Sequence, residues 1–110
     1  MAALGAALPA LTRLRNMEVC DNISVGDAGW TALAEALPRL PALRGLEATC
    51  CMTNAGALAI AAVLPRCSPT LAILRLSGDY HSVGEPPGEE ALSALRTAWG
   101  TRGDGLDARP

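Results

Sequence analysis

The chain repeats itself, and the length of the repeat limits the folds that it can adopt. When the sequence is shifted by 29 positions against itself, nine of the sixteen residues at 3–18 meet an identical residue. A third copy follows at a slightly shorter spacing, since Leu37-Pro38-Arg39 recurs as Leu64-Pro65-Arg66. A regular period of this length is typical of folds in which short units stack on one another.

Each unit combines a helical segment with an extended one. Residues 29–37 are rich in alanine and place Leu33 and Leu37 four positions apart, which indicates a helix with one apolar face. Pro38 follows and is expected to end that helix. The last residues of the segment 14–19 alternate between apolar and polar, as in a strand. Because neither segment buries its apolar face alone, the units are expected to pack against each other.

The pattern therefore predicts alternating helices and strands along most of the chain. The predicted helices are 2–8, 28–37, 55–64 and 88–98, and the predicted strands are 15–19, 44–48 and 72–76. With no Phe and one Tyr in the chain, the core is expected to consist mainly of alanine and leucine. Of the two tryptophans, Trp99 is expected to cover the C-terminal end of the core and Trp30 to be partly exposed.

The strand segments resemble the LxxLxLxxN/C pattern of leucine-rich repeat proteins. They read Leu14-Arg-Asn-Met17-Glu-Val19-Cys-Asp-Asn22, Leu43-Arg-Gly-Leu46-Glu-Ala48-Thr-Cys-Cys51 and Leu71-Ala-Ile-Leu74-Arg-Leu76-Ser-Gly-Asp79. With a unit of 28–29 residues and a helix in each unit, the chain is similar to the ribonuclease-inhibitor-like subclass, as in NOD-like receptors. Ala48 and Asp79 depart from the pattern, which calls for leucine and for asparagine or cysteine.

The resemblance implies an α/β fold: a right-handed solenoid of about three β-α repeats, with parallel strands on its concave face and helices outside. We expect residues 1–99 to form this domain. Residues 100–110 hold one large apolar side chain, Leu106, and are expected to form a disordered tail. Because a terminal repeat needs a polar outer face and Leu4, Leu8 and Leu11 offer none, the N-terminal edge is expected to meet further repeats, another domain or a second copy.

The resemblance also implies a non-enzymatic module that binds another protein through the concave face. The candidate contact residues point outward from the strands or lie in the loop 79–87, and they are Asn16, Glu18, Glu47, Thr49, Ile73, Arg75, Tyr80 and His81. Glu18, Glu47 and Arg75 are expected side by side, with Arg75 paired to Glu47. Two alternatives stay open: a regulatory segment of a GTPase-activating protein, and an inactive fragment of a longer repeat protein.

Charge and hydropathy exclude several other classes of partner. The net charge is −2, and the nine basic residues, all arginine, are spread singly along the chain, which argues against nucleic acid or an anionic membrane as the partner. No apolar run is long enough for a transmembrane helix. In the N-terminal segment Arg13 and Arg15 follow the apolar residues, unlike a secretory signal. A cytoplasmic protein is expected, with a mitochondrial transit peptide as the alternative.

The sequence predicts no catalytic residue, cofactor or metal site. The four cysteines, Cys20, Cys50, Cys51 and Cys67, lack the paired spacing of a zinc site, and His81 is the one histidine. We expect them to be reduced thiols that pack as small apolar side chains. Phosphate-binding glycine motifs are absent from the sequence.

Overall fold

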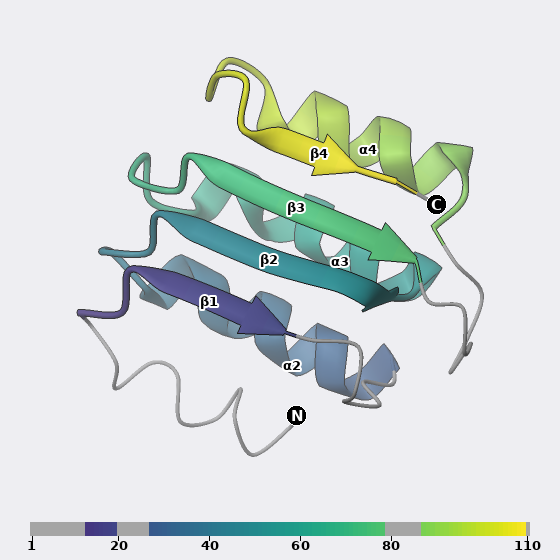
Figure 1. Cartoon of the computed structure of the whole chain (residues 1–110), viewed down its shortest axis with the longest axis horizontal. Coiled ribbons are helices and arrows are strands. Elements are labelled where there is room, and N and C mark those ends of the chain that lie inside the picture. The colour runs from purple at the N-terminus through teal and green to yellow at the C-terminus, as the bar shows by residue number, and fades with distance from the viewer. Residues whose placement is uncertain (1–12, 20–26, 79–86, 110) are drawn as a thin grey trace.

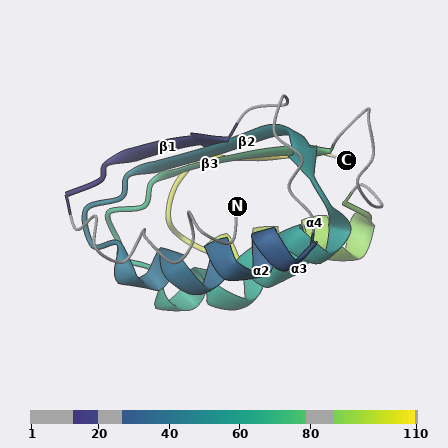
Figure 2. The same ribbon diagram turned by 90° about the horizontal axis from the view of Figure 1, so that it is seen from below.

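The computed structural model describes residues 13–19, 27–78 and 87–109. They form two layers: a sheet with the strand order β1-β2-β3-β4, and three α-helices that cover the same face of it (Figures 1 and 2). All three strand pairs are parallel. The strands are β1 (Asn16–Val19), β2 (Gly45–Met52), β3 (Ile73–Gly78) and β4 (Leu106–Ala108). The helices are α2 (Asp27–Ala36), α3 (Asn54–Val63) and α4 (Glu89–Trp99), with short 3-10 turns η2 (Leu37–Arg39) and η3 (Leu64–Arg66).

These elements confirm the expectation of an α/β fold with parallel strands. Three strands and three helices lie where the sequence predicts them, and their ends differ from the predicted ones by at most four residues. The helix predicted at 2–8 lies outside the described residues. The helix before Pro38 ends at Ala36, as expected, because a proline lacks the N–H that the next helical hydrogen bond needs.

Equivalent residues of successive repeats lie side by side in the sheet. Met17 pairs with Leu46, Leu46 with Leu74, and Leu74 with Leu106. These apolar side chains pack in or against the core between the sheet and the helices, and Leu46 and Leu74 are fully buried. Further fully buried members of the core come from the helices and the 3-10 turns: Trp30, Leu33, Ile60, Leu64, Ala91 and Leu95. Leucine and alanine thus dominate the core, as the composition predicts.

Both tryptophans belong to the core. Trp99 is 4% exposed and its indole Nε1–H donates a 3.0 Å hydrogen bond to the carbonyl oxygen of Gly103, which agrees with the expected position. The expectation for Trp30 is wrong, because its side chain is completely buried. It lies against Gly56 of the next helix, where an added Cβ would come within 2.6 Å of Trp30 Cγ. The missing side chain at Gly56 makes the room for this indole.

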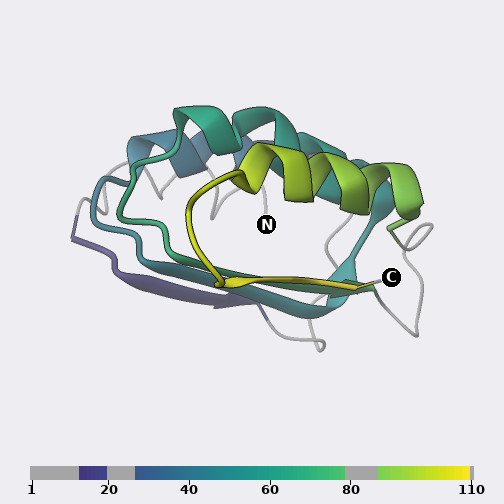
Figure 3. The ribbon, with the colours of Figure 1, turned by 90° about the horizontal axis from the view of Figure 1, so that it is seen from above.

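The disordered tail predicted for 100–110 needs correction over the described residues 100–109. This segment turns back from α4 and adds β4 to the sheet beside β3 (Figure 3). Gly105 makes the approach possible, since a Cβ there would overlap the carbonyl oxygen of Ala72. Arg102 reaches across the fold and donates hydrogen bonds to four backbone carbonyl oxygens, those of Leu64, Cys67, Ser68 and Leu71.

None of the helices in the described part of the chain has the length and apolar character needed to cross a membrane.

Candidate functional site

One face of the sheet is the candidate functional site, because the described helices all cover the other face (Figure 2). We call it the open face. Alternate residues of the strands point to it, and equivalent repeat positions stand next to each other in two rows. The first row is Asn16, Gly45 and Ile73, and the second row, the charged row, is Glu18, Glu47, Arg75 and Asp107.

The charged row crosses all four strands. Arg75 Nη1 donates to Glu47 Oε1 at 3.4 Å, so the ion pair predicted from the repeat register is present. The pair is long, and the two side chains are 57% and 37% exposed, so it contributes little to stability. Asp107 pairs at 2.8 Å with Arg109, two residues later in the chain. Glu18 stands directly beside Glu47 on the neighbouring strand, and like charges in this position repel each other.

The row of Asn16, Gly45 and Ile73 contains a hollow. Ile73 is 41% exposed and offers an aliphatic surface on the open face. Gly45 stands between Asn16 and Ile73 with no side chain of its own. A hollow of about 240 Å³ lies at this row, and it is lined by Asn16, Met17, Glu18, Gly45, Glu47 and Ile73. Its walls combine an aliphatic surface with two carboxylates.

A second hollow lies at the β3–β4 side of the open face. It measures about 250 Å³ and is lined by Arg75, Leu76, Ser77, Asp107 and Arg109. Its lining includes two guanidinium groups, one carboxylate, a serine and the buried Leu76. The open face thus changes in charge from acidic at β1 and β2 to mixed at β3 and β4.

The structure brings five of the eight predicted contact residues together on the open face: Asn16, Glu18, Glu47, Ile73 and Arg75. Thr49 lies on β2, but its side chain is outside the described part, and so are Tyr80 and His81 and the rest of the loop 79–86. The ninth repeat positions, Asn22, Asp79 and the side chain of Cys51, are outside it as well.

Sequence reasoning missed Asp107 and Arg109, which extend the open face at β4. Both lie in the segment 100–110, for which the single large apolar side chain, Leu106, predicts a tail, and an alternation of three residues, Leu106-Asp107-Ala108, is too short to indicate a strand. Pairing with β3 makes it one. Gly45 is not among the predicted contact residues, and only the structure shows that it lines a hollow.

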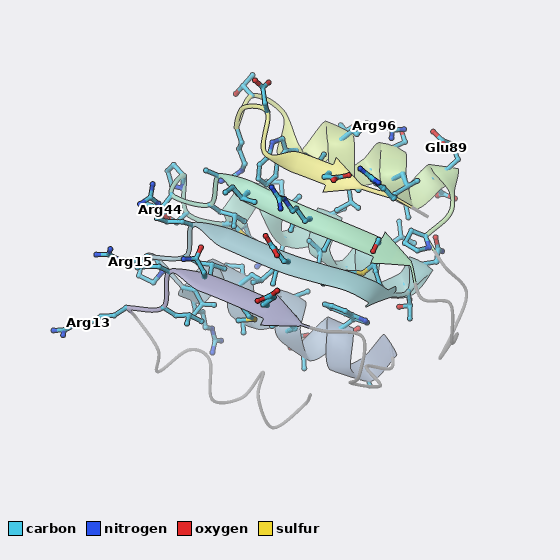
Figure 4. All side chains as sticks on the ribbon, viewed as in Figure 1. Arg13, Arg15, Arg44, Glu89 and Arg96 are labelled. Carbon is cyan, nitrogen blue, oxygen red and sulfur yellow. The ribbon has the colours of Figure 1, made fainter. Side chains whose placement is uncertain are left out.

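Exposed arginines gather at the edge where the strands begin. Figure 4 shows Arg13, Arg15 and Arg44 at this edge with their side chains extending away from the sheet. The backbone N–H of Arg44 donates to the carbonyl oxygen of Arg15, so the strands are already joined at this level. The guanidinium groups of these three arginines therefore lie outside the open face. They extend away from the carboxylates of Glu18 and Glu47.

The helix layer carries a separate groove. It lies between α3 and α4, measures about 720 Å³ and is lined mostly by small or apolar side chains, among them Leu58, Ala62, Ala94 and Ala98. Leu58 is 37% exposed. The groove offers apolar contact but few polar groups to orient a ligand.

Neither surface holds a recognisable catalytic or metal-binding arrangement in the part of the chain that the structure describes. Within residues 13–19, 27–78 and 87–109, no three histidine, cysteine or acidic side chains are placed to hold a metal ion. Cys67 is buried and its thiol donates to the carbonyl oxygen of Val63 at 3.4 Å. Burial raises the pKa of the Cys67 thiol, and the positive charges of Arg102 and Arg66 oppose that rise. This thiol packs as a small apolar group, as the sequence predicts.

The chain was compared with protein-family models, with curated proteins and with solved structures. Nothing matches in any of the three. A functional proposal for this chain depends on the open face of its sheet, which offers a broad surface of apolar, acidic and basic groups.

Proposed function

We propose that this protein is a non-enzymatic protein–protein interaction module that binds its partner through the open face. The observation that carries the proposal is Ile73: a 41% exposed isoleucine stands on the open face at the start of β3, next to a row of four charged residues. Buried apolar contact supplies binding energy, and charges around it select the partner. In this proposal the loop 79–87 adds contacts beside the face.

The shape of the face favours a protein over a small molecule. Its hollows of about 240 and 250 Å³ are below the usual range of small-molecule pockets, which begins near about 300 Å³. Four strands at a spacing of about 4.8 Å span about 14 Å, a width that suits a segment of another protein. Three carboxylates against two guanidinium groups on the two rows and beside β4 disfavour a nucleic acid.

The proposal includes the architecture that the repeats imply, a leucine-rich repeat solenoid of the ribonuclease-inhibitor-like type in the cytoplasm. Its support is the register: residues 28 or 29 positions apart, such as Asn16, Gly45 and Ile73, are direct neighbours in a parallel sheet. Stacked repeats produce this spacing because each unit adds one strand and one helix. In this architecture the open face is the inner, concave one.

The test is partner capture from cell extract with variants that differ only on the open face. Ile73→Arg and Glu47→Arg are each expected to reduce capture of the same protein by about tenfold or more, since both lie on the two inner strands of the face and line the same hollow. Leu58→Arg and Glu35→Arg are the matched controls, because both residues are exposed on the helix layer. These controls are expected to retain capture.

Two results would contradict the proposal. Capture that survives both open-face substitutions would exclude this face as the binding surface. Capture lost with Leu58→Arg alone would move the binding surface to the groove between α3 and α4.

A further inference from the structure

The hollow at Gly45 has a chemistry that points to one kind of guest. Asn16, Met17 and the buried backbone of Gly45 line it together with the exposed side chain of Ile73 and the carboxylates of Glu18 and Glu47. An aliphatic chain that ends in a cation would satisfy all of these groups, because its carbons would cover Ile73 and its charge would reach the carboxylates. Arginine and lysine are the side chains built in this way.

The two glutamates favour a cation for a second reason. Glu18 and Glu47 are direct neighbours in the β1–β2 register, a pairing of like charges that costs stability. Arg75 approaches Glu47 from β3, on the side away from Glu18, and at 3.4 Å its contact is long. The exposed arginines at the start of the strands extend away from the sheet (Figure 4). A cation placed between Glu18 and Glu47 would relieve their repulsion.

We propose that the hollow over Gly45 binds an arginine side chain of the partner protein, with its guanidinium between Glu18 and Glu47 and its methylene groups against Ile73. Arginine fits better than lysine because its planar fork of N–H donors can serve two carboxylates at once. The proposal rests on the proposed function, and it identifies the residue that the open face selects.

The experiment uses the full chain and two small probes. N-acetyl-arginine methylamide and its neutral isostere N-acetyl-citrulline methylamide are titrated separately while the backbone amide signals are followed by NMR. The arginine probe is expected to shift the Gly45 and Ile73 signals in a saturable way and to bind at least about fivefold more tightly than the citrulline probe. Added salt is expected to weaken the arginine probe selectively.

Two variants and one control test whether the probe binds in the hollow. Glu18→Gln is expected to weaken the arginine probe by about threefold or more, whereas Glu35→Gln makes the same charge change on α2 and should leave it unchanged. Gly45→Val fills the hollow and is expected to abolish the shifts. The new Cβ would lie 3.0 Å from Asn16 Oδ1 and 3.6 Å from Ile73 Cβ, so the free end of the Asn16 side chain has to move aside, and an unchanged amide spectrum away from the open face is the check that the fold is kept.

Equal binding of the two probes, or equal effects of Glu18→Gln and Glu35→Gln, would overturn the proposal. The result is separable from the test of the proposed function. If Ile73→Arg still prevents partner capture while the arginine probe does not shift Gly45, the open face binds the partner and this assignment of its guest is wrong. If the probe binds in the hollow but capture is insensitive to the open face, the assignment stands and the function proposal fails.

Discussion

The guanidinium of Arg102 donates a 2.8 Å hydrogen bond to the backbone carbonyl oxygen of Cys67, 35 residues earlier in the chain. The same side chain serves the carbonyl oxygens of Leu64, Ser68 and Leu71, so one arginine satisfies the turn between η3 and β3. Its guanidinium carbon also lies 6.0 Å from the centre of the Trp99 ring. Arg102 thereby joins the C-terminal segment to the preceding repeat.

Replacing Arg102 is expected to destabilise the protein strongly. Arg102→Ala leaves four carbonyl oxygens without their charged donor and should lower the free energy of unfolding by about 2–4 kcal/mol. Arg102→Lys keeps the positive charge but should recover only part of this loss, because an ammonium group has three donors and a guanidinium has five. Urea denaturation measures both. Arg109→Ala is the control, and its exposed pair with Asp107 should change stability by less than about 0.5 kcal/mol; an equal loss there would refute the role of Arg102.

The contact between Gly105 and Ala72 should make Gly105 intolerant of any side chain. A methyl group would overlap the carbonyl oxygen of Ala72, and Gly105 itself accepts a 2.8 Å hydrogen bond from the N–H of Leu74. Gly105→Ala is therefore expected to detach β4 and to raise amide hydrogen exchange at Leu74. Gly88→Ala, where the nearest atom is 3.6 Å away, should leave exchange unchanged. Unaltered protection of Leu74 in Gly105→Ala would show that the strand pairing tolerates the methyl group.

Gly56→Ala should destabilise α3 although alanine is the better helix former. The new Cβ would lie 2.6 Å from Trp30 Cγ, and forced repacking of the core costs about 1–3 kcal/mol. The control is the exposed Ala62→Gly in the same helix. It is expected to lower the free energy of unfolding by about 1 kcal/mol, the ordinary cost of glycine relative to alanine in a helix. A double-mutant cycle with Trp30→Leu should recover part of the loss at residue 56. Additive effects of the two substitutions would contradict a direct clash.

Burial of Cys67 predicts a loss of stability at alkaline pH. Desolvation raises the pKa of this thiol in the folded protein, so above the ordinary cysteine pKa of about 8.5 the unfolded chain binds fewer protons than the folded one. The contribution of Cys67 is therefore fully present below that pH and is lost as the pH rises through the folded pKa. Urea denaturation in reductant from about pH 7 to pH 10 should show a shallower decline for Cys67→Ala than for the parent. Identical slopes would exclude Cys67 as a cause.

Much of the candidate site follows from the repeat, because the repeat sets the register. Asn16, Glu18, Glu47, Ile73 and Arg75 could be placed on one face by counting along the strands, and the structure brings them together. The hollow was not foreseeable in this way. It depends on how far the neighbouring side chains spread over Gly45, and strand alternation carries no information about that.

The amino-acid sequence by itself determined β1, β2 and β3, the three helices and the order of these neighbours, since the alternation of apolar residues and the 28–29-residue period can be read along the chain without knowledge of the fold. Only the tertiary structure decided the burial of Trp30, the pairing of β4 with β3 and the bonds of Arg102. Each of these depends on contacts between segments far apart in the chain, where a missing side chain at Gly56 or Gly105 allows a close approach. Such complementarity of shape leaves no periodic signal in the sequence.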